Sequence, residues 1–599
     1  MSAKPTNPPA PPVWRRRLVL GVMLSLFALL GARVVHLQVV QHPHLQQQGD
    51  ARYLRELVVP PARGRILDRN GQVLTMSTPV DSLWAESAVF CAAQPQWKPM
   101  LGLIKTTAAQ LRARCERRKS ADFMYIERRL PPMLAQRVLQ LAIPGVEIQR
   151  EYKRYYPGGP AGAHLVGFTD VDDAGQEGLE RAYQAQLSGA PGRFLALKDR
   201  VGNYVESVES IQPVRHGSDL VISIDQRVQS LATDYLERAV RAHRAAGGSV
   251  VVLAVPSGEI IGMVNSPQFN PNDRSTLRDG RFRNRSVTDV IEPGSTVKPF
   301  TIAMALERGA LQADSIIDTA PGSYRVGAHT IHDVHDYGAI PVSEVIVRSS
   351  NIGAAKIALA LPYDDLFDTF ARLGFGRRAG NLPGETEGSL PRRGRPVEHA
   401  TLSYGYGLAV TPLQLARAYT ALATDGELLP VTLTRHAPGY RAAGARVFSA
   451  ATARAMRPML ERAASPEGTA RKARIPRYRI GGKTGTTHKL IDGAYQDRRY
   501  VSAFAGLAPL SAPKFVVVVV VDDPRGLLYY GGDVAAPVFA ALTEDLMRLY
   551  NIKPDRLAPN DARNDATAAK LSNDSRNADT DTTAAATAIT TAARSAEGA

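Results

Sequence analysis

A polar N-terminal segment followed by a long apolar run predicts a membrane-spanning helix over residues 18–40. A helix needs about 20 apolar residues to cross a bilayer, and this run reaches that length when Arg33 extends its charged end toward the far interface. The cluster Arg15–Arg17 precedes the run, which predicts that residues 1–17 stay in the cytoplasm and that the rest is exported. A cleaved signal peptide is the alternative, but continued hydrophobicity past Arg33 favours a retained anchor.

From about residue 50 to residue 215 the pattern is mixed, with short strand patterns and many turn residues. Residues 63–71 predict a strand that ends in an Asn-Gly turn, residues 155–159 a second turn, and residues 175–187 a helix. No serine or cysteine in this stretch is grouped with a general base. We therefore expect a scaffold, or pedestal, rather than a catalytic domain.

Residues 216–555 have a stronger periodicity. The patterns predict strands at 219–224, 248–255, 260–264 and 515–521, and a helix at 226–243. Strands at both ends of this stretch, with helices between them, predict a mixed α/β domain built on one sheet. Residues 556–599 carry almost no large apolar side chains, so we expect a disordered tail.

Composition narrows the function classes only slightly. The chain has 599 residues and a net charge of +16, which suits an anionic membrane surface or an acidic polymer. It has no zinc-finger spacing, basic heptad region or aromatic RNA-binding pattern, so we do not expect nucleic acid as a partner. Cys91 and Cys115 could pair in an oxidising compartment or could both be free, and neither stands in a C-x-x-C motif.

Ser295 and Lys298 form the first of three short motifs that carry chemistry. Pro293-Gly294 before an apolar run marks a turn into a helix, so Ser295 lies near the helix N-terminus and Lys298 one turn later on the same face. A serine hydroxyl needs a base within hydrogen-bond reach, and lysine can serve when burial or a neighbouring cation lowers its pKa. Free N–H groups at the helix start favour a developing oxyanion.

Ser349 and Asn351 form the second motif. A hydroxyl and a carboxamide two residues apart can relay a proton and hold a substrate amide. On their own, such residues are mostly turn and cap residues, so this motif has meaning only together with the others.

The third motif, Lys483-Thr484-Gly485-Thr486, predicts the edge of a strand. Glycine there lets a substrate backbone approach closely, lysine supplies positive charge, and the threonines can bind a carboxylate. A second cation at Lys483 would also help to keep Lys298 neutral enough to act as a base.

The order and spacing of these motifs resemble the penicilloyl-serine transferases. The chain as a whole resembles the class B penicillin-binding proteins, most closely the septal (cell-division) peptidoglycan D,D-transpeptidases. Besides the three motifs, the matching segments are 63–71, 156–158, 163–168, 284–285, 292–295, 403–407, 410–414, 529–532 and 536–539. Tyr-Gly-Tyr-Gly at 404–407 is similar to the septal type, whereas the elongation type is more similar to Gly-Gln-Gly there.

The resemblance implies a role for each catalytic residue. Ser295 looks like the acylated nucleophile and Lys298 like its general base. Ser349 and Asn351 look like the residues that relay the proton and hold the substrate amide. Lys483 looks like the second catalytic cation.

The resemblance also implies a substrate-binding strand. Thr484, Gly485 and Thr486 look like the carboxylate-binding segment, and the backbone N–H groups of Ser295 and Thr486 look like the oxyanion hole. Ser350 stands where the general pattern has aspartate, which leaves the detail of the proton relay open.

The implied fold is an N-terminal transmembrane helix, an elongated α+β pedestal and a transpeptidase domain, similar to serine β-lactamases, with a central antiparallel sheet flanked by helices. The implied activity is cross-linking of stem peptides from a D-Ala-D-Ala donor through an acyl-serine, in the D-Ala-D-Ala transpeptidase/carboxypeptidase class. β-Lactams would inhibit it, and no metal or cofactor is needed. The resemblance places the chain in the bacterial inner membrane with its catalytic domain in the periplasm. A septal glycosyltransferase and other division proteins would contact the anchor and pedestal.

Several alternatives remain. An elongation-type enzyme has the same motifs, and a non-catalytic division scaffold would not need Ser295, Lys298 and Lys483 intact. A β-lactamase is disfavoured because no Glu-x-x-x-Asn is placed to activate a deacylating water. A bifunctional enzyme is disfavoured because residues 50–215 show no glycosyltransferase signature.

Two further features of the sequence contain histidine and need an interpretation. The run His-Asp-Val-His-Asp at 332–336 looks like a metal cluster, because its two histidines, at i and i+3, could share a face. No third and fourth ligand is in sight, so we expect a structural loop. His488 follows the third motif closely, and we expect it to be an exposed strand residue.

Overall fold

The computed structural model describes residues 12–46, 54–117, 123–198, 204–273, 275, 280–392, 394–491 and 493–556. The chain divides into two compact units. Unit 1 comprises residues 1–62, 79–152 and 189–217, and unit 2 comprises residues 63–78, 153–188 and 218–599. The predicted disordered tail, from residue 557 on, and most of the predicted cytoplasmic segment lie outside the described residues.

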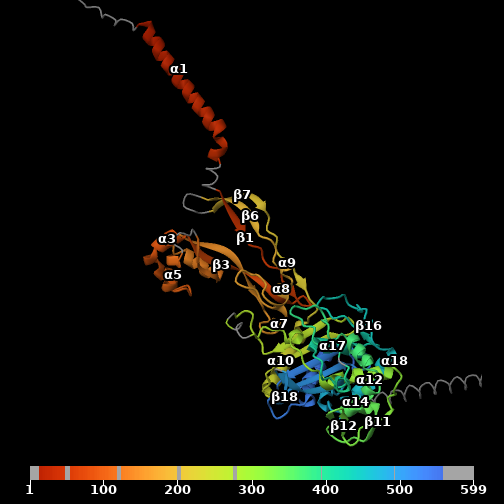
Figure 1. Ribbon diagram of the computed structural model, residues 1–599. Helices are drawn as coiled ribbons and strands as arrows, with labels where there is room; N and C mark the ends of the chain where they lie inside the picture. Colours follow the sequence, from red (N-terminus) through yellow and green to blue (C-terminus); the bar gives the residue numbers. More distant parts are fainter. Residues whose placement is uncertain are drawn as a thin grey trace, which may run out of the picture. The chain divides into compact units, whose positions relative to one another are not determined.

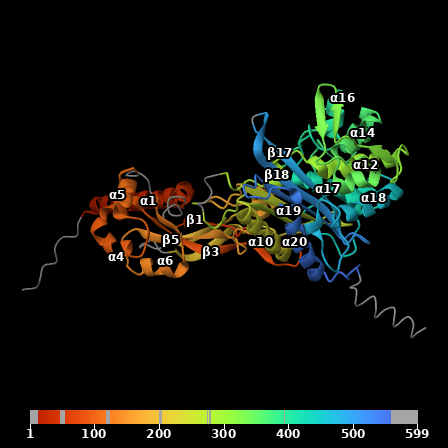
Figure 2. The same cartoon turned by 90° about the horizontal axis from the view of Figure 1, so that it is seen from below.

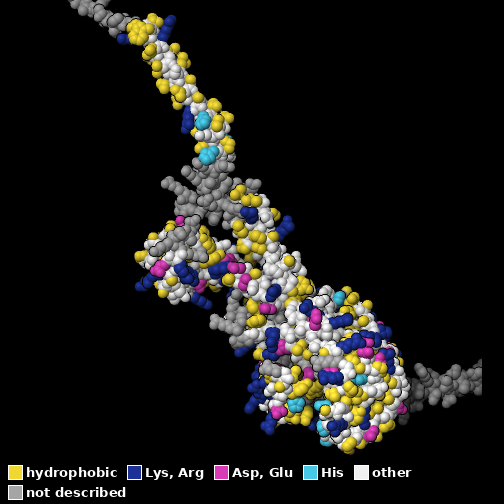
Figure 3. Space-filling view, in the orientation of Figure 1, with side chains coloured by type: hydrophobic (Ala, Val, Ile, Leu, Met, Phe, Trp, Pro, Cys, Tyr) yellow, Lys and Arg dark blue, Asp and Glu magenta, His cyan; other side chains and the backbone are white. Residues whose placement is uncertain are grey.

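The N-terminal apolar run forms helix α1, Val13–Val35, which continues as a π-helical segment, His36–Val40 (Figure 1). Its side chains are exposed and mostly apolar (Figure 3). Within the described residues it is the one helix long and apolar enough to cross a membrane. The helix begins five residues before the predicted start at 18, because the intervening arginines are good helix formers. It fits a single-pass anchor.

Unit 1 contains a three-stranded antiparallel sheet and a helical cluster with its own core. The sheet has the order β1–β6–β7, formed by Leu54–Val59, Gly192–Lys198 and Tyr204–Gln212. The cluster comprises α3 (Ser87–Ala92), α5 (Ala108–Arg117), α6 (Pro132–Leu139) and strand β4 (Met124–Leu130). Phe90 and Trp97 are buried at its centre, with their rings stacked 4.7 Å apart.

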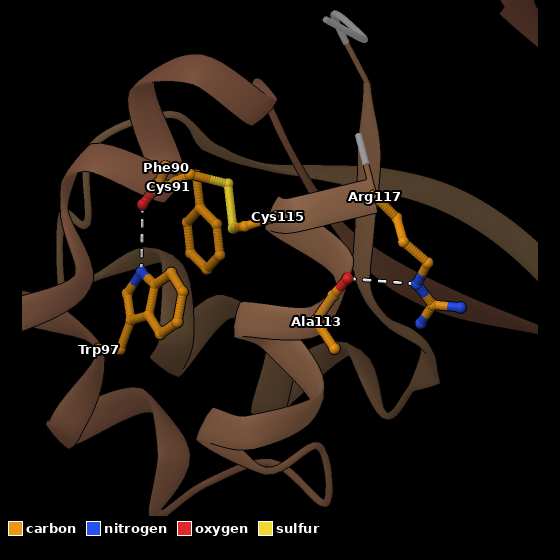
Figure 4. Close-up of a disulfide and its surroundings, with 6 residues drawn as sticks. All are labelled: Phe90, Cys91, Trp97, Ala113, Cys115 and Arg117. Carbon is orange, nitrogen blue, oxygen red and sulfur yellow. Dashed lines mark hydrogen bonds between the residues drawn. A yellow bond between two sulfur atoms is a disulfide. The ribbon is translucent and has the colours of Figure 1, made fainter. Parts of the chain in front are cut away.

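A disulfide between Cys91 and Cys115 joins α3 to α5 (Figure 4). The stacked rings of Phe90 and Trp97 lie beside it, and Trp97 Nε1 donates a hydrogen bond of 3.2 Å to the carbonyl of Phe90. The structure thus decides between the two alternatives that the sequence left open: the cysteines are paired.

Unit 2 is built on a five-stranded antiparallel sheet of order β10–β9–β19–β18–β17. The strands are β9 (Gly247–Ala254), β10 (Ile260–Ser266), β17 (Gly481–Ile491), β18 (Ala494–Ala508) and β19 (Phe515–Asp522). Three of the predicted strands are therefore confirmed to within two residues. The lysine-containing strand β17 lies at an edge, as its glycines and threonines predict.

Helices cover both faces of this sheet (Figures 1 and 2). On one face lie α10 (Gln226–Ala242) and α20 (Ala536–Leu549), and on the other lie α12 (Lys298–Glu307), α17 (Pro412–Ala423) and α18 (Ala450–Ala463). The valines of β19 alternate between the two cores: Val516, Val518 and Val520 join one, and Val517, Val519 and Val521 the other. This burial on both faces explains why β19 is continuously apolar.

A group of smaller elements in unit 2 lies next to α12. It comprises the helices α13 (Val342–Arg348), α14 (Asn351–Leu359), α15 (Tyr363–Arg372) and α16 (Pro396–Leu402), and the short strands β11 (Ile316–Asp318), β12 (Ser323–Val326), β13 (His329–His332) and β14 (Ala339–Pro341). Of these, α13, α14 and α15 contact α12 directly.

Two predicted elements differ from the structure. The strand expected at 219–224 is only β8, Leu220–Val221, which pairs in parallel with β2, Ile66–Leu67, and does not belong to the central sheet. The helix expected at 175–187 is two short helices, α8 (Gly178–Ala182) and α9 (Gln184–Leu187), because the backbone of Tyr183 leaves the helical region. The predicted Asn-Gly turn is confirmed, with Gly71 at φ 82°.

A buried ion cluster holds together the early segments of unit 2. Glu180 accepts from Arg63 Nε and Arg154 Nε, each at 2.6 Å, and all three side chains are at most 2% exposed. Arg63 also donates to the Glu180 carbonyl, at 2.7 Å. Arg63 opens the 63–71 segment, so the cluster explains why that segment begins with arginine.

Candidate active site

Ser295 lies in a 3-10 turn, Gly294–Val297, that leads directly into α12. Its side chain is half-buried, and the predicted place near a helix N-terminus is confirmed. The turn is packed tightly against the 404–407 segment: Gly294 N donates to Gly405 O at 3.1 Å. A Cβ atom on Gly405, where φ is +89°, would lie 2.2 Å from Gly294 O, so only glycine fits there.

Lys298 brings the first two motifs together. Its ammonium is completely buried and donates to Ser349 O at 2.5 Å, to Asn351 Oδ1 at 2.8 Å and to Ser349 Oγ at 3.3 Å. Ser295 and Lys298 are three residues apart across a 3-10 turn, where such positions lie over one another. The charged lysine uses all three of its N–H donors on the second motif.

The second motif is held in shape by Asp333, which the sequence predicts only as part of a structural loop. Ser349 has a left-handed backbone, with φ 61°, and ends α13, while Ser350 caps α14 by accepting from Gly353 N. Asp333 accepts from Ser350 Oγ and, at 2.5 Å, from Asn351 N.

Asp333 therefore belongs to the site although its loop looked only like a false metal cluster. Its neighbour His332 also contributes, since the His332 carbonyl accepts from Asn351 Nδ2 at 3.0 Å. Within the described ranges, no group of three or more His, Cys, Asp or Glu side chains could hold a metal ion. The signal that could have revealed Asp333 is Ser350, which stands where an acidic residue is usual and leaves room for a carboxylate from elsewhere.

The third motif lies on β17 beside the Ser295 turn. Lys483 is completely buried, and its Nζ lies 3.3 Å from Thr484 Oγ1 and 3.5 Å from Thr469 Oγ1. Gly485 allows the close approach: a Cβ there would meet Pro293 O and Thr296 Cγ2 at 2.9 Å. Thr486 Oγ1 accepts from Gly531 N at 2.9 Å, which fixes its hydroxyl.

Burial gives both lysines unusual acid–base properties. The pKa of Lys298 lies well below its usual value, first because the ammonium is removed from water and second because Lys483 is nearby. Asp333 acts in the opposite direction and raises it. Burial lowers the pKa of Lys483 to about 7.

The rim of the site is aromatic and includes Glu292. Tyr406 and Tyr495 face each other with ring centroids 5.9 Å apart, and Glu292 Oε1 accepts from Tyr495 at 3.1 Å and from Gly407 N at 2.8 Å. Burial raises the pKa of Glu292. His488 is exposed on β17 against Tyr500, with ring centroids 4.8 Å apart, as expected for a strand residue.

Comparison with known proteins agrees with this geometry. The penicillin-binding protein transpeptidase domain matches residues 248–544, and the penicillin-binding protein dimerisation domain matches residues 58–222. The peptidoglycan D,D-transpeptidase FtsI of Escherichia coli is 40% identical over 557 residues, which cover 92% of this chain and 94% of that one.

The chain is a class B penicillin-binding protein.

Other relatives support the same placement. The probable peptidoglycan D,D-transpeptidase PenA of Neisseria gonorrhoeae is 39% identical, covering 90% of this penicillin-binding protein and 94% of its own length. Among solved structures, penicillin-binding protein 3 of Mycobacterium tuberculosis, complexed with aztreonam, has a TM-score of 0.64 at 27% identity, covering 83% and 98% of the two chains. The transpeptidase domain of penicillin-binding protein 3 from Burkholderia pseudomallei has a TM-score of 0.52 at 39% identity, covering 56% and 98%. The predicted family, its septal type and the mixed α/β fold with an antiparallel sheet are confirmed.

Proposed function

We propose that this penicillin-binding protein cross-links peptidoglycan stem peptides at the division septum through an acyl-enzyme on Ser295. The observation that carries the proposal is Lys298: a fully buried amine with a lowered pKa, one turn from Ser295 and bonded to Ser349 and Asn351. A buried, partly neutral lysine beside a serine at a helix start is the arrangement that activates a serine hydroxyl.

In the first step Ser295 Oγ attacks the carbonyl carbon between the two D-alanines of the donor. Neutral Lys298 takes the hydroxyl proton and becomes an ammonium, whose N–H groups can donate to Ser349 and Asn351. Ser349 Oγ then passes its proton to the leaving D-alanine nitrogen as the C–N bond breaks, and the Lys298 ammonium, which donates to Ser349 Oγ, replaces that proton. Asn351 holds the substrate amide.

The third motif positions the donor and stabilises charge. The edge of β17 is available to an extended peptide, and Gly485 leaves space for that backbone. Thr484 and Thr486 bind the terminal carboxylate with Lys483 nearby. The N–H groups of Ser295 and Thr486 receive the oxyanion.

In the second step an amine of a neighbouring stem peptide attacks the acyl-serine carbonyl. The amine gives a proton to neutral Lys298 as the new C–N bond forms, the C–O bond to Ser295 breaks, and Lys298 passes that proton to Ser295 Oγ. A β-lactam takes the place of the donor in the first step. When its ring opens, the expelled nitrogen stays attached to the acyl group, so it does not depart as D-alanine does and it hinders the acceptor amine in the second step.

The wider assignment follows from the anchor and the domain organisation. We assign residues 1–17 to the cytoplasm, 18–40 to the inner membrane, 41–215 to the pedestal, 216–555 to the periplasmic transpeptidase domain, and 556–599 to the tail. The arginines before α1 support this orientation, and a disulfide in unit 1 suits an oxidising compartment. A septal glycosyltransferase and other division proteins would contact the anchor and pedestal.

The test is labelling of membranes with a fluorescent penicillin. We expect a covalent band near the chain mass of 64.7 kDa that persists for tens of minutes and disappears in Ser295→Ala. Ser230→Ala, at an exposed serine on α10, is the matched control and keeps the band. A band that is absent, or that survives Ser295→Ala, contradicts the proposal and favours the scaffold. A band that decays within seconds favours a β-lactamase.

A further inference from the structure

Thr469 lies beside the third motif, although it belongs to the segment between α18 and β17. Its hydroxyl oxygen is 2.8 Å from Thr484 Oγ1 and 3.5 Å from Lys483 Nζ. Within the described part of the chain, these are the two hydrogen-bond neighbours of that hydroxyl. Threonine hydroxyls in turns commonly bond to their own backbone, so a hydroxyl directed at a strand 14 residues later indicates a role in the site.

The position of Thr469 is fixed on both sides by its backbone. Ala470 N donates to Ala463 O, at the end of α18, at 3.0 Å. On the other side lies α19 (Gly531–Val534), where Gly532 packs so closely that a Cβ atom on it would lie 2.2 Å from Thr469 O. The hydroxyl of Thr469 is therefore presented to the third motif by contacts that do not depend on its side chain.

The hydrogen-bonding capacity of these groups decides the direction of the bond between the two threonines. A lysine ammonium has three donors and no acceptor, whereas a hydroxyl has one proton and two acceptor positions. Charged Lys483 can therefore only donate, to Thr469 Oγ1 and to Thr484 Oγ1, which lies 3.3 Å away. The Thr469 hydroxyl, which accepts from Lys483, gives its own proton to Thr484.

The Thr484 oxygen then accepts two hydrogen bonds, one from Lys483 and one from Thr469. With both acceptor positions filled, the Thr484 proton must point away from these two groups. A hydroxyl whose proton has a fixed direction suits an anion, because a hydrogen bond to a charged acceptor is stronger than one between neutral groups. Without Thr469, one acceptor position of Thr484 is open and the direction of its proton is no longer fixed.

We propose that Thr469 is a positioning residue for donor recognition: its hydroxyl orients the Thr484 proton toward the terminal carboxylate of the donor. This inference rests on the proposed function, which assigns that carboxylate to Thr484 and Thr486. Thr469 thereby helps the site to distinguish a donor that ends in a free carboxylate from one whose carboxyl group is blocked. Because it lies outside the three motifs, their residues alone do not account for this selectivity.

The experiment compares two acylating ligands on the full-length protein in detergent: benzylpenicillin, which has a free carboxylate, and its methyl ester, which has none. Stopped-flow and intact-mass measurements, at concentrations that acylate the parent, give rate constants for the parent, Thr469→Val and Thr469→Ser. We expect Thr469→Val to lower the second-order rate constant for benzylpenicillin about fivefold, because an oriented hydrogen bond to a charged group is weakened. The rate constant for the ester should change by less than about twofold, and Thr469→Ser, which keeps the hydroxyl, should restore the parent value.

A purely structural role of Thr469 predicts a different result. Valine has nearly the shape of threonine and Thr469 is exposed, so the melting temperature of Thr469→Val should match that of the parent. Thr434→Val, at an exposed threonine outside the site, is the matched control and should leave both rate constants unchanged. An equal loss for benzylpenicillin and its ester, an unchanged rate constant for benzylpenicillin, or no restoration by Thr469→Ser overturns the proposal.

A double-mutant cycle tests the route through Thr484. If Thr469 acts by orienting the Thr484 hydroxyl, Thr469→Val should change the rate constant for benzylpenicillin by less than about twofold in a Thr484→Val background. Additive losses would mean that Thr469 acts on the carboxylate independently, and they overturn the positioning role.

The parent protein separates this inference from the proposed function. A parent that benzylpenicillin does not acylate at Ser295 overturns both, because Thr469 then has no donor to position. A parent that is acylated, beside a Thr469→Val variant with the same rate constants, leaves the proposed function in place and overturns the role of Thr469 alone.

Discussion

Unit 2 contains two groups of buried cations, and they are arranged in opposite ways. Arg63 and Arg154 share the carboxylate of Glu180 at 2.6 Å on each side. Lys298 and Lys483 are just as buried, but the hydrogen bonds of both go to hydroxyl, amide and carbonyl oxygens. The first group is neutralised by direct contact, and the second is not.

The two groups of cations therefore suit different purposes: the paired arginines suit stabilisation of the fold, and the unpaired lysines suit proton transfer. A guanidinium stays charged at any pH that the protein meets, so burying it requires an anion in contact. A lysine ammonium can instead lose its proton when it is buried without a paired carboxylate. Unit 2 thus uses arginine where a permanent charge joins segments, and lysine where the proposed mechanism moves a proton.

The largest expected effect comes from Lys298→Met, which keeps the length of the side chain and removes the amine. We expect acylation by penicillin to fall about 10³-fold, because Ser295 loses its base. The melting temperature should stay the same or rise, since a buried cation without a contacting anion is replaced by an apolar group. Stopped-flow acylation and thermal unfolding measure the two effects. A clear loss of stability would mean that Lys298 is a structural cation like Arg63.

Glu180→Gln tests the other group. Two buried guanidinium groups would lose their anion, so we expect unfolding of unit 2 to become easier by about 3–5 kcal/mol. Acylation of the fraction that remains folded should be unchanged. Asp234→Asn, which removes an exposed ion pair with Arg238, is the control and should change stability by less than about 1 kcal/mol. Denaturant titration provides the comparison, and an equal effect of both variants would refute the structural role of Glu180.

Asp333→Asn sharpens the comparison, because Asp333 is the carboxylate that acts on Lys298 from a distance. Its loss weakens the cap of α14 and should cost about 1–2 kcal/mol. It also removes an influence that raises the pKa of Lys298. The acid limb of the acylation rate should therefore move to lower pH. If the acid limb of the pH–rate profile stays at the same pH, or moves to higher pH, Asp333 only supports the helix.

The last expected effect, which is small over a narrow pH range, is on stability against pH. Burial lowers the pKa of Lys483 to about 7, whereas the unfolded chain keeps a value of about 10.4. Between these values the unfolded chain binds more protons, so stability rises with pH across the window, by at most about 1.4 kcal/mol per unit. Below about pH 7 both states hold the proton and the slope disappears. Lys483→Met should have a smaller slope than the parent in parallel melting curves, since Lys298, whose pKa is also lowered, still contributes. Identical slopes would rule out the lowered pKa of Lys483.

The sequence predicts those parts of the molecule that depend on local pattern. Strand β19 and helix α10 could be predicted directly. Strand β19 is buried on both faces and is therefore continuously apolar, whereas α10 is buried on one face and has apolar residues at helical spacing. The three motifs could be read as well, since each is a run of adjacent residues. The strand expected at 219–224 failed because its partner, β2, lies about 150 residues earlier in the chain.

Contacts between distant segments could not be predicted from pattern. Asp333 contacts the second motif across 17 residues, and Glu180 joins Arg63 across 117. Neither carboxylate has a neighbour in the sequence that reveals its partner. The pairing of Cys91 with Cys115 was open for the same reason, because two cysteines alone do not disclose their distance.

The disulfide of unit 1 also means that the oxidation state of Cys91 and Cys115 indicates whether a copy of the chain has been exported. Cysteines stay reduced in the cytosol and pair in oxidising compartments, so on the proposed orientation a copy carries two thiols before export and none afterwards. The cross-link joins two helices of one small core, which means that this core reaches its final form only on arrival. The pedestal therefore matures only when the chain is translocated. The fraction of copies whose thiols react with an alkylating reagent measures how many molecules have not yet been exported.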